Sequence, residues 1–182
     1  FIIFYLRLKH YFNKNSYSGS KKNISFHYDL GNSFYEYWLD KSMTYSSAIF
    51  NKNNNDLYKA QINKYKSLVK LIDVKKEDKI LEIGCGWGGF SCYLAKKHSC
   101  DVTAITISKK QYEKVKEKIF NEKLNEKVNV KLIDYRETKG LFDKIVSIEM
   151  FEAVGEKYWS KYFQVLQGNL KPNGSIGLQT IT

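Results

Sequence analysis

The stretch LEIGCGWGGFSCYLA, residues 81–95, decides the fold. Four glycines fall within the six residues 84–89, between a short apolar run and a run with helical spacing. Glycine weakens both helices and strands, so such a cluster predicts a tight turn where the backbone approaches something closely. The stretch therefore predicts a strand over 79–83, a glycine-rich turn, and a helix over 89–98.

Strands and helices alternate on the carboxyl side of this turn. Further strands are predicted at 101–106, 128–133, 142–149 and 175–181, and further helices at 109–124 and 156–170. Another helix is predicted before the turn, capped by Asp56 and running to about Ile72. This order indicates an α/β fold: a parallel, doubly wound, Rossmann-like sheet covered on both faces, with its ligand at the carboxyl ends of the strands.

The composition is that of a globular protein of one domain, or of one domain with an appendage. Hydrophobic residues make up 43% of the 182 residues and aromatic residues 15%. No apolar run is long enough to span a bilayer. The cysteines Cys85, Cys92 and Cys100 form no CxxC pair, so we interpret them as small buried residues of a protein in a reducing cytoplasm. Because the chain begins without Met and stops after an apolar run, we expect a fragment.

The net charge of +11 leaves two interpretations open. It reflects either a compositional bias toward Lys and Asn or attraction to a polyanion, which would be nucleic acid or an anionic membrane surface. An amino-methylating enzyme of RNA would need an [ND]-P-P-[YF] loop, and the chain has a single proline, Pro172. We therefore expect no nucleic-acid partner.

The spacing of the glycines favours S-adenosylmethionine (SAM) over a dinucleotide. A dinucleotide site calls for G-x-G-x-x-G and an acid at the end of the next strand. Here Glu82, Gly84, Gly86 and Gly88 give E-x-G-x-G-x-G, which resembles motif I of Rossmann-like SAM methyltransferases. That motif puts a carboxylate near the amino-acid end of SAM.

The second strand ends in AITISKKQ, residues 104–111, with no acid to hold a ribose. Two interpretations of this end stay open. Ser108 and Gln111 form an S-x-x-Q capping box, or Thr106 and Gln111 hydrogen-bond the ribose hydroxyls instead.

Several motifs together resemble one family. HYDLGNSFYEYWLDKSMTYSSAIF (27–50), LEIGCGWGGF (81–90), AITISKKQ, DYR (134–136) and FDKIVSIEMFEAVG (142–155) have the order and spacing of the cyclopropane-fatty-acyl-phospholipid synthase family. That family includes the mycolic acid cyclopropane synthases. The resemblance implies a class I SAM methyltransferase core at 61–182, truncated after its fifth strand. It also implies a helical lid at 23–60, which follows a basic, amphipathic segment and linker at 1–22.

The resemblance also implies which residues contact SAM. They are Tyr45, Ser46, Glu82, Gly84, Cys85, Gly86, Trp87, Gly88, Thr106, Ile107, Ser108, Gln111, Tyr135 and Arg136. Tyr135 and Arg136 would lie by the adenine. Asp134 would be either a loop acid or a partner for the adenine amino group.

The implied reaction transfers a methylene group to the double bond of an unsaturated acyl chain. The SAM sulfonium must be held in line with the double bond, and aromatic faces stabilise the carbocation that forms next. Candidates for those faces are Tyr28, Phe34, Tyr45 and Phe151, with ordinary core packing as the alternative. In the family a bound bicarbonate then removes a proton, and the implied catalytic positions here are Ser47, Glu152, Gln179, Ile181 and Tyr28.

Three positions depart from the family pattern. Ala153 and Gln179 stand where histidines are expected, and Ser47 stands where a cysteine is expected. Glutamine can hydrogen-bond an anion but cannot titrate near neutrality as histidine can. Two products therefore stay open, a cyclopropane ring or a methyl-branched chain from a fatty-acyl C-methyltransferase.

We therefore predict a SAM-dependent enzyme without a metal site that acts on unsaturated phospholipid acyl chains. We expect it in the cytoplasm, peripheral at the inner membrane face. The oligomeric state stays open, with a homodimer as the candidate. A non-catalytic membrane-surface fragment that binds SAM, or nothing, also stays open.

Overall fold

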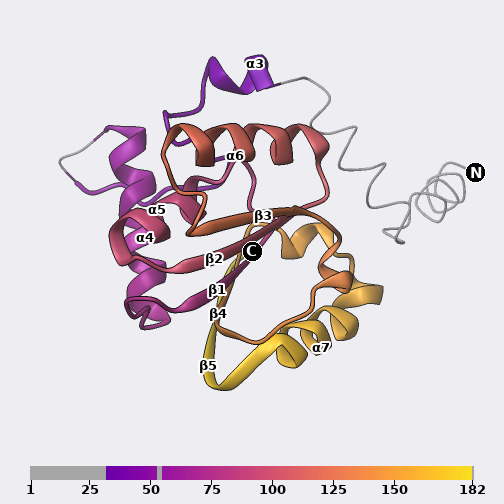
Figure 1. Cartoon of the computed structure of the whole chain (residues 1–182). Helices are drawn as coiled ribbons and strands as arrows, with labels where there is room; N and C mark the ends of the chain where they lie inside the picture. The colour runs from indigo at the N-terminus through magenta and orange to yellow at the C-terminus, as the bar shows by residue number, and fades with distance from the viewer. Residues whose placement is uncertain (1–31, 53–54, 182) are drawn as a thin grey trace, which may run out of the picture.

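The structure, a computed structural model, describes residues 32–52 and 55–181 and has a parallel sheet at its centre (Figure 1). Its five strands are β1 (Lys79–Ile83), β2 (Asp101–Thr106), β3 (Val128–Leu132), β4 (Phe142–Ile148) and β5 (Leu170–Gln179). They lie in the order β3-β2-β1-β4-β5, and every neighbouring pair is parallel. The prediction of a parallel sheet is confirmed.

Helices cover both faces of the sheet, as predicted (Figure 1). The helices are α3 (Asn32–Glu36), α4 (Leu57–Leu71), α5 (Gly89–His98), α6 (Lys109–Asn121) and α7 (Trp159–Asn169), with 3-10 turns at Tyr135–Glu137, Phe151–Ala153 and Glu156–Tyr158. Side chains alternate between the two faces along each strand. Ile80 packs on the face under α4, α5 and α6, whereas Leu81 packs on the face under α7.

Most predicted boundaries agree with the structure, and the differences have local causes. The elements at 79–83, 89–98 and 101–106 match their predictions. Helix α6 ends at Asn121 instead of 124, because Lys123 adopts a left-handed backbone with φ +56°. Strand β5 runs over Leu170–Gln179 instead of 175–181, and its register against β4 shifts before it becomes regular at Ser175.

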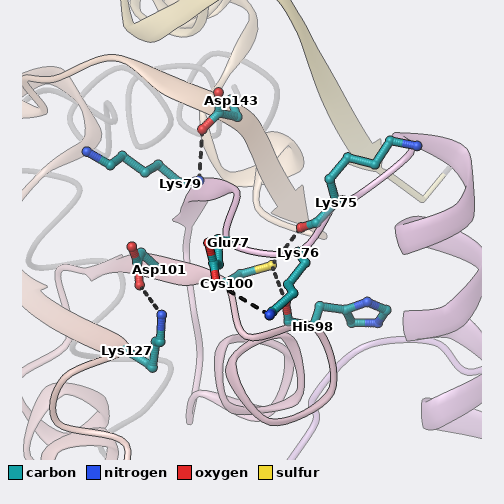
Figure 2. A network of polar contacts seen from close by, with 9 residues as sticks. All are labelled: Lys75, Lys76, Glu77, Lys79, His98, Cys100, Asp101, Lys127 and Asp143. Carbon is teal, nitrogen blue, oxygen red and sulfur yellow. Dashed lines mark hydrogen bonds and ion pairs between the residues drawn. The ribbon is translucent and has the colours of Figure 1, made fainter.

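Polar contacts hold the amino ends of the strands, opposite the edge at which a ligand is expected (Figure 2). The backbone N–H of Lys79 donates to Asp143 at 2.9 Å, which ties β1 to β4. Lys127 pairs with Asp101 at 2.9 Å and joins the start of β2 to the loop before β3. The buried thiol of Cys100 donates to the carbonyl of Lys75 at 3.5 Å. These contacts stabilise the edge of the sheet that lies opposite the expected ligand site.

The segment before α4 lies against the glycine turn. Glu36 pairs with Lys114 of α6 at 3.3 Å, and Lys118 of α6 donates to the carbonyl of Ser42 at 3.3 Å. The ring of Tyr35 lies 4.8 Å from that of Trp87, which belongs to the glycine turn. We call residues 42–47 the strap, because they cross the carboxyl edge of the sheet.

The lid at 23–60 and the core at 61–182 stay predictions as domains. The segment 1–22, the start of the lid and Tyr28 lie outside the described residues. Within the described part of the chain, no helix combines the length and apolar character needed to cross a membrane. All three cysteines are free and buried, as predicted.

Candidate active site

A cavity of about 350 Å³ lies at the carboxyl ends of β1, β2 and β4. Its lining comes from the glycine turn, the strap, the end of β2 with Gln111, the loop after β3 and the residues directly after β4, with Tyr35 and Tyr65 beside them. This edge is where an open α/β sheet binds its ligand, and the volume is that of a small-molecule site. The cavity therefore occupies the position that the glycine pattern predicts.

The glycines of the turn have different tasks. The backbone N–H groups of Gly84 and Cys85 both donate to the carbonyl of Ile105 at 3.0 Å, which fixes the turn beside β2. Gly86 has φ +53°, and a Cβ there would meet nothing within 4 Å, so its face is open to a ligand. A Cβ on Gly88 would lie 3.1 Å from Val115, so this glycine lets α5 pack on α6. Gly88 does not line the cavity.

Glu82 places a buried carboxyl group in the wall of the cavity. It accepts a hydrogen bond from the hydroxyl of Ser91, and burial raises its pKa to about 7. The buried ammonium group of Lys64 donates to the Ser46 hydroxyl at 2.5 Å, and burial lowers the pKa of Lys64 to about 8. An acid held near its point of ionisation can receive a cationic ligand group.

The end of β2 combines parts of both interpretations of AITISKKQ. Ser108 caps α6 by accepting the backbone N–H of Gln111 at 3.3 Å. The Gln111 side chain does not complete the capping box, because its Oε1 accepts the Thr106 hydroxyl at 2.7 Å. Thr106 and Gln111 line the cavity and Ser108 does not. Ser108 is therefore a capping residue outside the cavity lining.

The loop after β3 is fixed by an acid. Asp134 is buried and accepts Arg136 Nε and Nη2, each at 2.7 Å, and also the backbone N–H of Arg136 at 2.9 Å. These contacts agree with Asp134 as a loop acid, and because Asp134 also lines the cavity, its contact with the adenine amino group stays a prediction. The ring of Tyr135 meets that of Tyr162 edge-on at 5.3 Å. Both Tyr135 and Arg136 line the cavity.

All residues predicted to contact SAM except Gly88 and Ser108 thus line one cavity. These are Tyr45, Ser46, Glu82, Gly84, Cys85, Gly86, Trp87, Thr106, Ile107, Gln111, Tyr135 and Arg136. Their contact with SAM itself stays a prediction.

The predicted catalytic residues form two pairs beside the cavity. The Ser47 hydroxyl accepts Gln179 Nε2 at 3.0 Å, and Glu152 accepts the backbone N–H of Ile181. Among the described residues, none of these four lines the cavity.

Glu149 was not predicted from the sequence, yet it lines the cavity and contacts the first pair. A signal was present, because the acid directly succeeds β4, which neighbours β1, and carboxyl ends of parallel strands share one edge. The motif IEMFEAVG holds two acids, and the prediction fell on the second, Glu152.

The aromatic residues divide between the cavity and its surroundings. Tyr45 lines the cavity, whereas Phe34 is 44% exposed and Phe151 packs on Trp159 at 5.2 Å. Tyr35, which was not predicted, also lines the cavity, and its ring lies 5.4 Å from that of Tyr45. An aromatic wall is therefore present on the strap side.

Comparison with known proteins assigns the family. Residues 15–182 match the family model described as mycolic acid cyclopropane synthetase. The chain belongs to this family. Its relatives in the cyclopropane synthetase family include the cyclopropane-fatty-acyl-phospholipid synthase of Escherichia coli (strain K12), which is 41% identical over 155 residues. That match covers 85% of this chain and 39% of the relative.

A second relative carries a different name. The protein named "Probable fatty acid methyltransferase" of Pseudomonas putida is 38% identical, over 87% of this chain and 41% of its own length. The chain thus spans about two fifths of the length of these two relatives.

Solved structures of cyclopropane synthases share the fold. The cyclopropane synthase MmaA2 of Mycobacterium tuberculosis has a TM-score of 0.85 at 30% identity, over 89% of this chain and 57% of that one. The mycolic acid cyclopropane synthase CmaA1, complexed with SAH and CTAB, has a TM-score of 0.82 at 29% identity, over 87% of this chain and 55% of that one. The predicted Rossmann-like class I methyltransferase fold is confirmed.

Proposed function

We propose that the protein transfers a one-carbon unit from SAM to the double bond of an unsaturated fatty acyl chain of a phospholipid, closing a cyclopropane ring. One observation carries this proposal. In a chain of the cyclopropane synthetase family, the glycine turn and the strap line the same cavity, so the turn expected to hold the nucleoside lies beside an aromatic wall.

The residues of the cavity fit SAM. Glu82 offers a carboxyl group for the cationic amino-acid end, and Gly86 leaves open space for close approach of a ligand to the backbone. Thr106 and Gln111 offer hydrogen-bonding groups at the end of β2, where the ribose is expected. When bound, SAM supplies a methyl group on a positively charged sulfur. The chain holds that methyl group in place, and positioning supplies much of the rate when the nucleophile is a weak alkene.

Bicarbonate fits this chain less well than SAM. The groups expected to hold it, the amide of Ser47 and the side chain of Gln179, donate to the carboxylate of Glu149 instead. A second anion there would lie against a like charge, which is unfavourable in a partly buried site. We therefore derive no step through bicarbonate.

A fatty-acyl C-methyltransferase that leaves an open chain is the second candidate. It is favoured by the Pseudomonas putida relative, which is named a fatty acid methyltransferase. The two candidates share the SAM site and differ in the step after methyl transfer.

We further propose that the protein acts in the cytoplasm at the inner face of a membrane. A lysine-rich hollow between the strap, α4, α5 and α6 supports this placement. It is lined by Lys41, Lys59, Lys66, Lys96, Lys97 and Lys118, together with His98. Such a surface is attracted to anionic lipid head groups by about 1 kcal/mol per lysine near the membrane.

Two measurements test the proposal. Calorimetric titration with SAM tests the cofactor, and mass spectrometry of unsaturated phosphatidylglycerol vesicles incubated with protein and SAM tests the product. We expect a gain of one CH₂ with loss of the double bond. A product that gains CH₂ and keeps an olefin establishes the open-chain candidate, and SAM binding without any modified lipid refutes both.

A further inference from the structure

Three hydrogen-bond donors converge on one oxygen of Glu149. Its Oε1 accepts the backbone N–H of Ser47 at 2.9 Å, the hydroxyl of the same serine, and Gln179 Nε2 at 2.9 Å. Ser47 and Gln179 are two of the residues to which the family resemblance assigns a bound bicarbonate. An amide N–H, a hydroxyl and a carboxamide can hold either a small oxyanion or a carboxylate side chain. In this structure they hold the chain's own carboxylate.

The backbone at Glu149 is arranged to bring the carboxylate to this place. Its φ of +48° is in the left-handed region, which a non-glycine residue seldom adopts. Its N–H donates to the carbonyl of Gln179 at 2.8 Å, so the end of β4 is tied to β5 at the residue that also holds the carboxylate. Backbone strain of this kind is characteristic of functional sites, because the surrounding structure must sustain it.

Glu149 is also the one member of this group that reaches the cavity. Among the described residues, Ser47, Glu152, Gln179 and Ile181 lie outside the lining, whereas Glu149 belongs to it. Its second oxygen, Oε2, has no hydrogen-bond donor in the described part of the chain. The lone pairs of Oε2 are therefore available to a proton of the substrate.

A buried cation lies close enough to act on this carboxylate. Burial lowers the pKa of Lys64, and the negative charge of Glu149 is the largest electrostatic influence opposing that change. The opposite charges of Lys64 and Glu149 attract each other across the wall of the cavity.

We infer that the carboxylate of Glu149 is the base of the reaction, in the position that the family resemblance assigns to bicarbonate. This inference rests on the proposed function. It adds a catalytic residue to the cavity and makes the reaction independent of dissolved bicarbonate.

The step balances in atoms and electrons. The double bond of the acyl chain supplies the electron pair for a new C–C bond to the methyl carbon of SAM, and the C–S bond breaks with its pair going to sulfur. The other alkene carbon becomes a cation. A C–H bond of the new methyl group then breaks, its electron pair closes the ring, and its proton goes to Glu149 Oε2. The proton leaves Glu149 for water after the product departs.

The test compares four variants with the unchanged protein for lipid product, SAM affinity and response to bicarbonate. Glu149→Gln keeps the size of the side chain and removes the base, and Glu149→Gly empties the position with a residue that accepts φ +48°. Glu152→Gln removes the other acid. Glu156→Gln changes an exposed acid on a neighbouring turn and is the matched control.

We expect the unchanged protein to turn over equally in bicarbonate-free buffer and in buffer with bicarbonate added. Glu149→Gln should lose at least about a hundredfold in turnover, the usual scale for an acid–base group, with SAM affinity within about threefold. Glu149→Gly should regain at least about tenfold of its loss when bicarbonate or formate supplies the missing base. Glu152→Gln should lose less than Glu149→Gln, and Glu156→Gln should lose nothing.

A second readout does not depend on turnover. In ¹³C NMR with labelled bicarbonate, Glu149→Gly should broaden the bicarbonate resonance and the unchanged protein should not. The inference is overturned if removal of bicarbonate stops the unchanged protein, if Glu149→Gln turns over normally, or if Glu152→Gln loses more. Absence of lipid product from the unchanged protein, with SAM still bound, contradicts the proposed function on which the inference rests.

Discussion

Gly89, the first residue of α5, supports the strap directly. A Cβ at this position would lie 2.5 Å from the hydroxyl of Tyr65, 2.8 Å from that of Thr44 and 3.0 Å from the carbonyl of Ser42. Tyr65 is 1% exposed and its hydroxyl is hydrogen-bonded to that of Thr44, so neither group can simply turn aside. Gly89→Ala should therefore push the strap away from the glycine turn.

These contacts determine how much Gly89→Ala should lower the free energy of unfolding. An added methyl group in a packed site costs about 1–3 kcal/mol, and loss of the Thr44–Tyr65 hydrogen bond costs about 1 kcal/mol more. Higher helix propensity returns at most about 1 kcal/mol. We expect the free energy of unfolding to fall by about 1–3 kcal/mol. Affinity for SAM should fall as well, because Thr44 and Ser46 line the cavity.

Gly168 provides the matched control. It lies within α7, and a Cβ there would meet nothing within 4 Å. Gly168→Ala should therefore raise the free energy of unfolding by about 0.5–1 kcal/mol and leave SAM affinity unchanged. Urea denaturation monitored by circular dichroism measures both variants. Equal stabilities for the two alanine variants would refute the argument that the strap fills the space beside Gly89.

Three further predictions concern the cavity. Because the folded pKa of Glu82 is about 7, above its ordinary 4.5, the folded state keeps this proton longer. Stability of the ligand-free protein should therefore fall by up to about 3 kcal/mol as pH rises from about 4.5 to about 7.5, and urea unfolding of Glu82→Gln should lack this loss. SAM affinity should rise with pH as Glu82 ionises, and the positive charge of Lys64 lowers the pKa of Glu82. In Lys64→Met, calorimetry should therefore show this rise at higher pH. An unchanged pH profile would show that Lys64 does not affect the ionisation of Glu82. Gly86→Ala places a methyl group in the open face of the turn, and SAM affinity should fall at least about tenfold while the protein remains folded by circular dichroism.

Much of the fold could be predicted, because the signals for it are local. Asp56 caps α4 by accepting the backbone N–H of Lys59 at 2.9 Å, and a capping residue before an apolar periodic run is visible in sequence. The β5 boundary could not be predicted, because KPNG is typical of a turn and its pairing with β4 depends on tertiary contact. The α6 boundary depended on a left-handed residue, Lys123, which no residue type announces.

The residues of the candidate site could be predicted where a polar residue lies at or near the carboxyl end of a predicted strand. Glu82, Thr106 and Gln111 met that condition, and all three line the cavity. Glu149 also met it, but the family pattern directed attention to Glu152. The role of Gly88 depended on the side chain of Val115, a packing fact that spacing alone does not contain. Capping by Ser108 was one of the two interpretations that the sequence left open.

The strap joins two tasks in six consecutive residues. Thr44 and Ser46 line the cavity, and the backbone N–H of the next residue, Ser47, donates to the carboxylate of Glu149. A change that moves the strap therefore alters both the cavity proposed for SAM and the position of Glu149, the proposed base. Substitutions in the strap that are meant to change the acyl preference would therefore affect both methyl transfer and proton removal. A library of such variants must be screened for both steps.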